Sequence, residues 1–147
     1  MQIQQLSIEE QARFGATHKA VISAALGDFT AAATTQSFTL APLVAGHKID
    51  NAFVRVPTLL SGGAVSAATI TLGDGSAAAG YVTSTNVFTG GVQNKAGDGT
   101  LFNQAGGKMY TGADNLVVAL TTTSANVVAL TAGEINVYFS LAQVTGL

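Results

Sequence analysis

The residues of this chain that could bind a metal ion are few and lie far apart in the sequence. The two histidines, His18 and His47, are each followed by a lysine, and the chain has no cysteine. A zinc site needs at least three nitrogen, sulfur or oxygen ligands close together. We therefore expect no metal site, and we interpret both histidines as exposed turn residues.

Two glycine-flanked aspartates resemble fragments of calcium-binding loops, Gly73-Asp74-Gly75 and Gly97-Asp98-Gly99. Each segment offers a single carboxylate, whereas calcium takes six to eight oxygen ligands and usually several carboxylates. Glycine supplies positive φ and aspartate bonds its own backbone, so both segments are better explained as turns. A glycosidase would need both carboxylates in one cleft, one of them with a raised pKa, and nothing in the sequence indicates such a cleft.

No other catalytic constellation is visible, since no serine sits in a nucleophile elbow and no histidine–aspartate pair is indicated. We therefore expect no enzymatic activity, no catalytic residues and no cofactor. A small hydrolase of unfamiliar type stays open as an alternative that would need an acid or hydroxyl cluster.

Composition indicates a protein whose surface is largely covered by other protein. The chain has 147 residues, the size of one domain, and its charged residues make up 10% of it, against about 25% in ordinary soluble domains. The six basic residues are scattered, which argues against nucleic acid as a partner because phosphate binding needs clustered lysine and arginine. A surface solvated by Thr, Ser, Asn and Gln without charge is the alternative.

Nothing in the sequence indicates export or membrane insertion. The N-terminus, MQIQQLSIEEQARFG, lacks the basic and then apolar layout of a signal peptide. No apolar run approaches the roughly 20 residues of a spanning helix. We expect the protein to be made in a cytoplasm and to stay soluble or assemble there.

Short apolar and Thr-rich segments that alternate with Gly-Asp turns predict an all-β fold, a single β-sandwich of jelly-roll type. Pro42 marks an edge or a bend, and the alternation slips near Ala52, which predicts a β-bulge. The glycine-rich stretch Gly90–Gly107 is expected to be a long functional or mobile loop. The expected strands cover residues 18–26, 36–44, 48–57, 68–72, 81–88, 116–123, 127–130 and 134–144.

The first seventeen residues differ from the rest and show no strand pattern. Ser7 followed by Glu9 and Glu10 predicts a short capped helical turn. We expect residues 1–17 to form an N-terminal arm and residues 18–147 to form the sandwich. The arm would reach a neighbouring subunit, and an ordinary frayed terminus is the alternative.

Four segments carry a resemblance to a known family. They read DNAFVRVPTLLSGGAVSAATITLGDGS, GYVTSTNVFTGG, GGKMYTGADNLVVALTTT and LTAGEINVYFSLAQV, and they run from Asp50 to Val144. They resemble small virion proteins encoded among the head genes of tailed bacteriophages, which join an apolar strand to a GDG-type turn and close on a "G-x-x-x-V-Y" strand.

The resemblance implies a β-sandwich subunit that binds the outside of an assembled head as a decoration or cement protein. Its partner would be the major capsid protein, its location the capsid surface of a virion assembled in the host cytoplasm, and its favoured state a homotrimer. A head-fibre or tail adhesin domain that binds a host glycan or receptor through Gly90–Gly107 is the alternative. Our own inference places capsid contact in the arm, at Gln4, Gln5, Leu6, Glu9, Glu10, Arg13 and Phe14.

Overall fold

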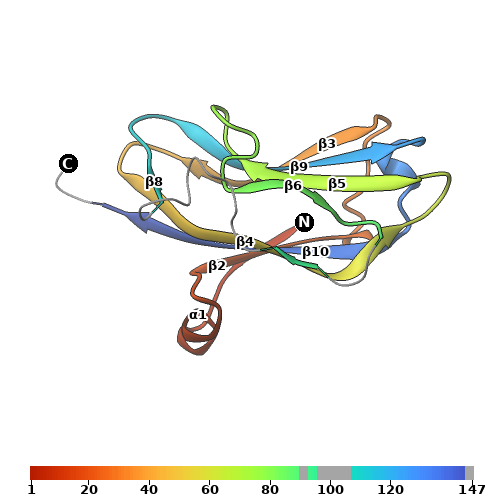
Figure 1. The fold of residues 1–147 in the computed structure, drawn as a ribbon. Coiled ribbons are helices and arrows are strands. Elements are labelled where there is room, and N and C mark those ends of the chain that lie inside the picture. The colour runs from red at the N-terminus through yellow and green to blue at the C-terminus, as the bar shows by residue number, and fades with distance from the viewer. Residues whose placement is uncertain (90–92, 96–106, 145–147) are drawn as a thin grey trace.

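The protein is a sandwich of two antiparallel sheets, here called sheet A and sheet B (Figure 1). The computed structural model describes residues 1–89, 93–95 and 107–144. The predicted all-β sandwich is confirmed, and the described helices are short.

Within the described residues, sheet A contains six strands and sheet B contains four. In spatial order, sheet A consists of β1 (Gln2–Gln5), β2 (His18–Ser23), β10 (Ala132–Gln143), β4 (His47–Ser61) and β7 (Gln93–Lys95), with β8 (Lys108–Met109) also paired to β4. Sheet B consists of β3 (Thr35–Leu43), β9 (Asp114–Thr123), β5 (Ala67–Gly73) and β6 (Val82–Asn86). The described helical segments are α1 (Ile8–Phe14) and the 3₁₀ turns η1 (Ala24–Leu26) and η2 (Val127–Ala129).

The main core lies between the two sheets and follows from the period-two alternation of the strands. Ile135, Val137 and Phe139 of β10 are almost completely buried. From sheet B, β9 contributes Leu116, Val118 and Leu120 to the same hydrophobic cluster. Each such side chain stabilises the fold by about 1.5–3 kcal/mol relative to an exposed position.

Two local predictions in the middle of the chain are confirmed. Tyr138 lies opposite Phe53 and Ser140 lies opposite Asp50, so β4 holds one more residue than β10 over this stretch. Asn51 takes a positive φ of 48° within that bulge, beside the predicted position at Ala52. Pro42 lies in β3, which is an edge strand of sheet B, where its missing N–H interrupts no internal ladder.

Other predictions are wrong or fall outside the described residues. The segment predicted as a strand at residues 127–130 is the 3₁₀ turn η2, because a short apolar run fits a helical turn as well as a strand. Within the predicted loop Gly90–Gly107, Gln93–Lys95 forms β7 against β4. Most of the remaining loop, including Gly97-Asp98-Gly99, lies outside the described residues.

The N-terminal segment also differs from the predicted arm, because Gln2–Gln5 is an edge strand of sheet A. β1 pairs in antiparallel register with β2. Its four residues are exposed on both faces, which explains why they show no apolar alternation. The expectation of an arm without strand structure is therefore corrected.

The predicted helical turn is confirmed as α1, which projects from the outer side of sheet A (Figure 1). Leu6 and Ala16 flank α1 and are buried against Tyr138 in a second, small hydrophobic cluster. The ring of Tyr138 lies between Phe14, at 4.8 Å, and Phe53, at 4.9 Å. Strand β10 is consequently buried on both faces at its centre.

Replacement of Ser7 by alanine is expected to loosen α1 while leaving the sandwich intact. The Ser7 hydroxyl accepts a hydrogen bond from the Glu10 amide, and the Glu10 carboxylate accepts one from the Ser7 amide. Losing such a cap costs about 1 kcal/mol, so amides of α1 should exchange about fivefold faster. Hydrogen exchange measures this, with Ser84→Ala at an exposed position of β6 as the control. Unchanged exchange in Ser7→Ala would contradict the cap.

Candidate interaction surface

The charged residues are divided unequally between the two sheets. Every basic residue of the chain lies in α1 or in a strand of sheet A. These residues are Arg13, Lys19, Lys48, Arg55, Lys95 and Lys108. The four strands of sheet B carry one charged residue, Asp114, at the first position of β9. One layer of the sandwich is therefore nearly free of charge.

The outer face of sheet B consists of short uncharged side chains in rows across the strands. Pairing aligns Thr35 with Thr121, Thr121 with Thr69, and Thr69 with Asn86. These side chains alternate with the core residues of the same strands, so they point away from sheet A. The Thr-rich face, as we call it, comprises Thr35, Ser37, Thr39, Ala67, Thr69, Thr71, Asn86, Val117, Ala119, Thr121 and Thr123, all exposed or half-buried.

This composition suits a surface that another protein covers. Thr and Ser hydroxyls both donate and accept hydrogen bonds, so they can pair with backbone or side-chain groups of a partner. Thr and Val are stiff at χ1 and lose little rotamer freedom when they are covered. When a partner covers this face, no charged side chain of the face has to be removed from water. Such desolvation is costly for any ion that remains unpaired.

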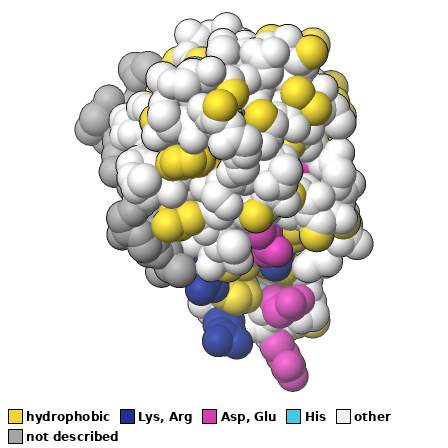
Figure 2. Space-filling model, turned by 90° about the vertical axis from the view of Figure 1, so that its right-hand side faces the viewer, with side chains coloured by type: hydrophobic (Ala, Val, Ile, Leu, Met, Phe, Trp, Pro, Cys, Tyr) yellow, Lys and Arg dark blue, Asp and Glu magenta, His cyan; other side chains and the backbone are white. Residues whose placement is uncertain are grey.

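The loops at one end of the sandwich are also almost uncharged. Residues 24–34, 61–66 and 124–131 contain a single charged residue, Asp28, whose carboxylate binds the N-terminal ammonium of Met1 and the amide of Ser23. Figure 2 shows this end of the molecule, where charged side chains gather at the lower edge, on the side of α1. Leu26 and Val128 are exposed here.

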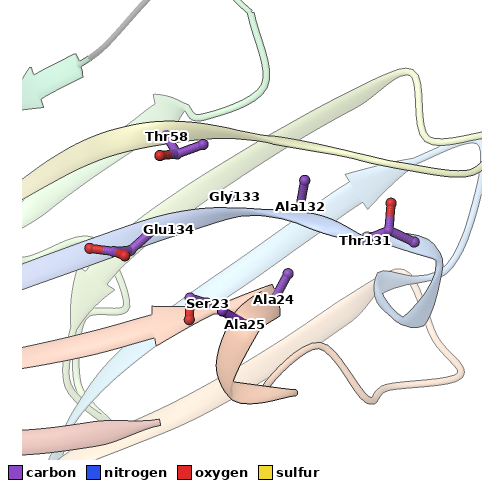
Figure 3. Close-up of a pocket in the computed structure, with 8 residues that line it drawn as sticks. All are labelled: Ser23, Ala24, Ala25, Thr58, Thr131, Ala132, Gly133 and Glu134. Atoms are coloured by element: carbon purple, nitrogen blue, oxygen red, sulfur yellow. The ribbon is translucent and has the colours of Figure 1, made fainter.

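A groove of about 330 Å³ lies at the same end, along β10 and between η1 and β4 (Figure 3). It is lined by Ser23, Ala24, Ala25, Thr58, Thr131, Ala132, Gly133 and Glu134. The Glu134 carboxylate accepts a hydrogen bond of 2.9 Å from the side-chain amide of Asn136. With a single carboxylate and no aromatic ring in its lining, the groove offers neither a pair of catalytic acids nor a stacking platform for a sugar.

The buried carboxylate of Asp74, at the opposite end of the sandwich, accepts several hydrogen bonds. One oxygen of its buried carboxylate accepts from the amides of Ser76 and Ala77, at 2.9 and 3.0 Å. The other accepts from Lys108 Nζ at 2.6 Å and from the Tyr110 hydroxyl at 2.8 Å. Burial raises the pKa of this carboxyl, but the hydrogen bonds from Lys108, Ser76 and Tyr110 outweigh burial and lower the pKa to about 2.

Both oxygens of Asp74 are thus used by donors of the protein itself, and the turn predicted at Gly73-Asp74-Gly75 is confirmed. The described part of the chain holds no group of three His, Asp or Glu side chains that could bind a metal ion. The Tyr110 hydroxyl lies 2.8 Å from that of Tyr81, and burial raises the pKa of both phenols. The arrangement is that of a structural network that ties β8 to the turn after β5.

The two histidines are not the exposed turn residues that the sequence suggested. His18 lies in β2, half-buried, and its ring stacks on Phe139 with the centroids 5.3 Å apart. Burial lowers the pKa of His18. His47 begins β4, and its Nδ1 accepts a hydrogen bond of 3.3 Å from the Val44 amide.

The residues predicted to contact a capsid all lie on the side of sheet A. Leu6 is 3% exposed and Phe14 is half-buried against Tyr138, so these two serve the small cluster beside α1. The other five predicted residues are exposed at the surface: Gln4, Gln5, Glu9, Glu10 and Arg13. The structure therefore presents two distinct surfaces, α1 with β1 on one layer and the Thr-rich face on the other.

Comparisons of this chain with protein-family models, with curated proteins and with solved structures found no match. No helix in the described residues is long and apolar enough to cross a membrane.

Proposed function

We propose that this protein is a structural virion component that attaches to the outer surface of a bacteriophage head and stabilises or decorates it. The observation that carries the proposal is the separation of charge, with every basic residue in α1 or sheet A and an uncharged outer face on sheet B. A subunit that lies against a protein shell needs such a face and needs no active site. The resemblance of residues 50–144 to phage head proteins supports the same function.

A jelly-roll topology is part of this proposal. Leaving aside β1 and β8, the strand order is β2-β10-β4-β7 in sheet A and β3-β9-β5-β6 in sheet B. Successive strands cross between the sheets at β2–β3, β3–β4 and β4–β5, which supports two interlocked Greek keys. Such a fold is stiff and protects its strand edges, as a surface component of a virion requires.

The proposed partners are the major capsid protein and other copies of this chain, arranged as a homotrimer on the capsid surface. Attachment of several subunits together strengthens binding, because each further contact becomes intramolecular once the first is made. Binding to the shell would also stabilise the folded subunit by mass action.

The test is co-sedimentation with assembled heads of the phage that encodes the chain. The wild-type protein is expected to pellet with the heads in a saturable manner and to stay in the supernatant without them. Heads already saturated with unlabelled protein serve as the control for non-specific trapping. Failure to pellet at tens of micromolar protein would contradict the proposal, and binding to host cells instead would favour the adhesin alternative.

A further inference from the structure

We infer that the Thr-rich face is the surface by which the protein lies on the shell, and that the shell presents an uncharged surface to it. The inference rests on the proposed function and assigns the contact to sheet B. It differs from the prediction made from the sequence, which placed the contact at the N-terminus.

The chemistry of the face specifies the chemistry of its partner. A partner that placed a lysine or a glutamate over Thr121 or Thr69 would bury that charge without an ion of opposite sign, because the face has none to offer. Hydroxyl rows instead pair with backbone carbonyls, amides and other hydroxyls. The matching surface on the shell is therefore uncharged and rich in such groups.

The area of the face favours a shell over a second copy of this chain as the occupant. The strands lie about 4.8 Å apart and rise about 3.4 Å per residue, so seven residues of each of β3, β9 and β5 and the five of β6 cover about 420 Å². A pair of such faces would bury about 850 Å² in total, below the roughly 1,200 Å² of stable interfaces between two free proteins. A shell presents the same site many times. The subunits of the proposed homotrimer can therefore bind to it together, and their individually weak contacts strengthen one another.

This orientation turns α1 and the outer face of sheet A away from the shell. Lys48 of sheet A and the exposed residues Glu9 and Arg13 then face water, where charge keeps particles apart. The unequal charge of the two sheets is explained in this way, because the uncharged outer face of sheet B is covered by the shell and the charged sheet A is solvated.

The inference is tested by adding one positive charge at a time and measuring binding to heads. Thr71→Lys and Thr121→Lys place a lysine on the Thr-rich face, and Gln2→Lys places one on exposed β1 as the matched control. We expect the two face variants to bind heads at least tenfold more weakly and the control to bind as wild type does. Wild-type binding should also change little between about 0.05 and 0.5 M salt, because no ion pair would be screened.

Any other result would contradict a specific part of the proposal. Wild-type protein that does not bind heads overturns the proposed function itself. Wild-type binding that Thr71→Lys and Thr121→Lys leave unchanged overturns only the assignment to sheet B, and loss of binding in Arg13→Glu instead would assign the contact to α1.

Two measurements on the free proteins complete the test. A lower mass by light scattering for the face variants would show that the face joins copies of this chain, which also overturns the inference. If a face variant melts early, Ser37→Lys at an exposed position of the edge strand β3 replaces it.

Discussion

Replacement of Asp74 by alanine is expected to lower the free energy of unfolding by about 3 kcal/mol at neutral pH. The substitution removes the acceptor of Lys108 Nζ and of the Tyr110 hydroxyl, and it also removes the acceptor of two turn amides. Breaking a buried ion pair on one side leaves donors without partners, which costs more than losing the attraction alone. Urea unfolding at pH 7 measures the change.

The pH dependence of stability provides a second readout for Asp74. Its pKa falls from 3.8 to about 2 on folding, so the ionised form stabilises the folded state by about 2 kcal/mol. This contribution is fully present above about pH 4 and is lost as the pH falls through 2. The variant Asp74→Asn should lack this part of the acid dependence.

Asp50→Ala is the control for Asp74, because Asp50 pairs with Lys48 at 3.3 Å on the surface and is 40% exposed. Exposed pairs contribute about 0–1 kcal/mol. If Asp50→Ala and Asp74→Ala were equally destabilising, the buried network would have no special role.

The sandwich itself was predictable because its signals are local. The alternation of Ile135, Val137 and Phe139 indicates a strand with one buried face wherever that strand lies. The turn at Asp74 is likewise specified by neighbouring residues, since its carboxylate bonds amides two and three positions later.

The parts that sequence reasoning missed depend on contacts between distant residues. Gln2–Gln5 becomes a strand only because β2 offers it a free edge, and its own pattern does not show this. Leu6 and Phe14 looked like contact residues within a polar segment, yet they are held by Tyr138, far away in the sequence.

The Thr-rich face was visible in the sequence only in fragments. The alternation of Thr69 and Thr71 with Ile70 and Leu72 is evident within β5. The sequence does not show that Thr35 and Thr121 lie in the same row, because this follows from the order of strands in sheet B. The absence of charge from segments 35–43, 67–73, 82–86 and 115–123 was the available signal, and it identifies a surface only once these segments share a sheet.

Replacement of Gly133 by alanine is expected to destabilise the fold by about 3 kcal/mol or more. Gly133 has a φ of +117°, a conformation that is essentially restricted to glycine. A Cβ atom there would lie 2.6 Å from Leu60 Cα and 2.9 Å from the Leu59 carbonyl oxygen, so backbone would have to move. Strain and overpacking each cost about 1–3 kcal/mol.

The position matters because Gly133 lies where the two longest strands of the described residues pair irregularly. Ala132 is opposite Ser61 and Glu134 is opposite Thr58, so β4 bulges past Gly133. Gly112→Ala is the matched control, since a Cβ atom at Gly112 meets nothing within 4 Å and no positive φ is required. Urea unfolding should show Gly133→Ala strongly destabilised and Gly112→Ala close to wild type. Equal stability of the two variants would mean that the bulge between β4 and β10 adapts to a side chain, and the close approach of Leu60 to β10 would not be required for the fold.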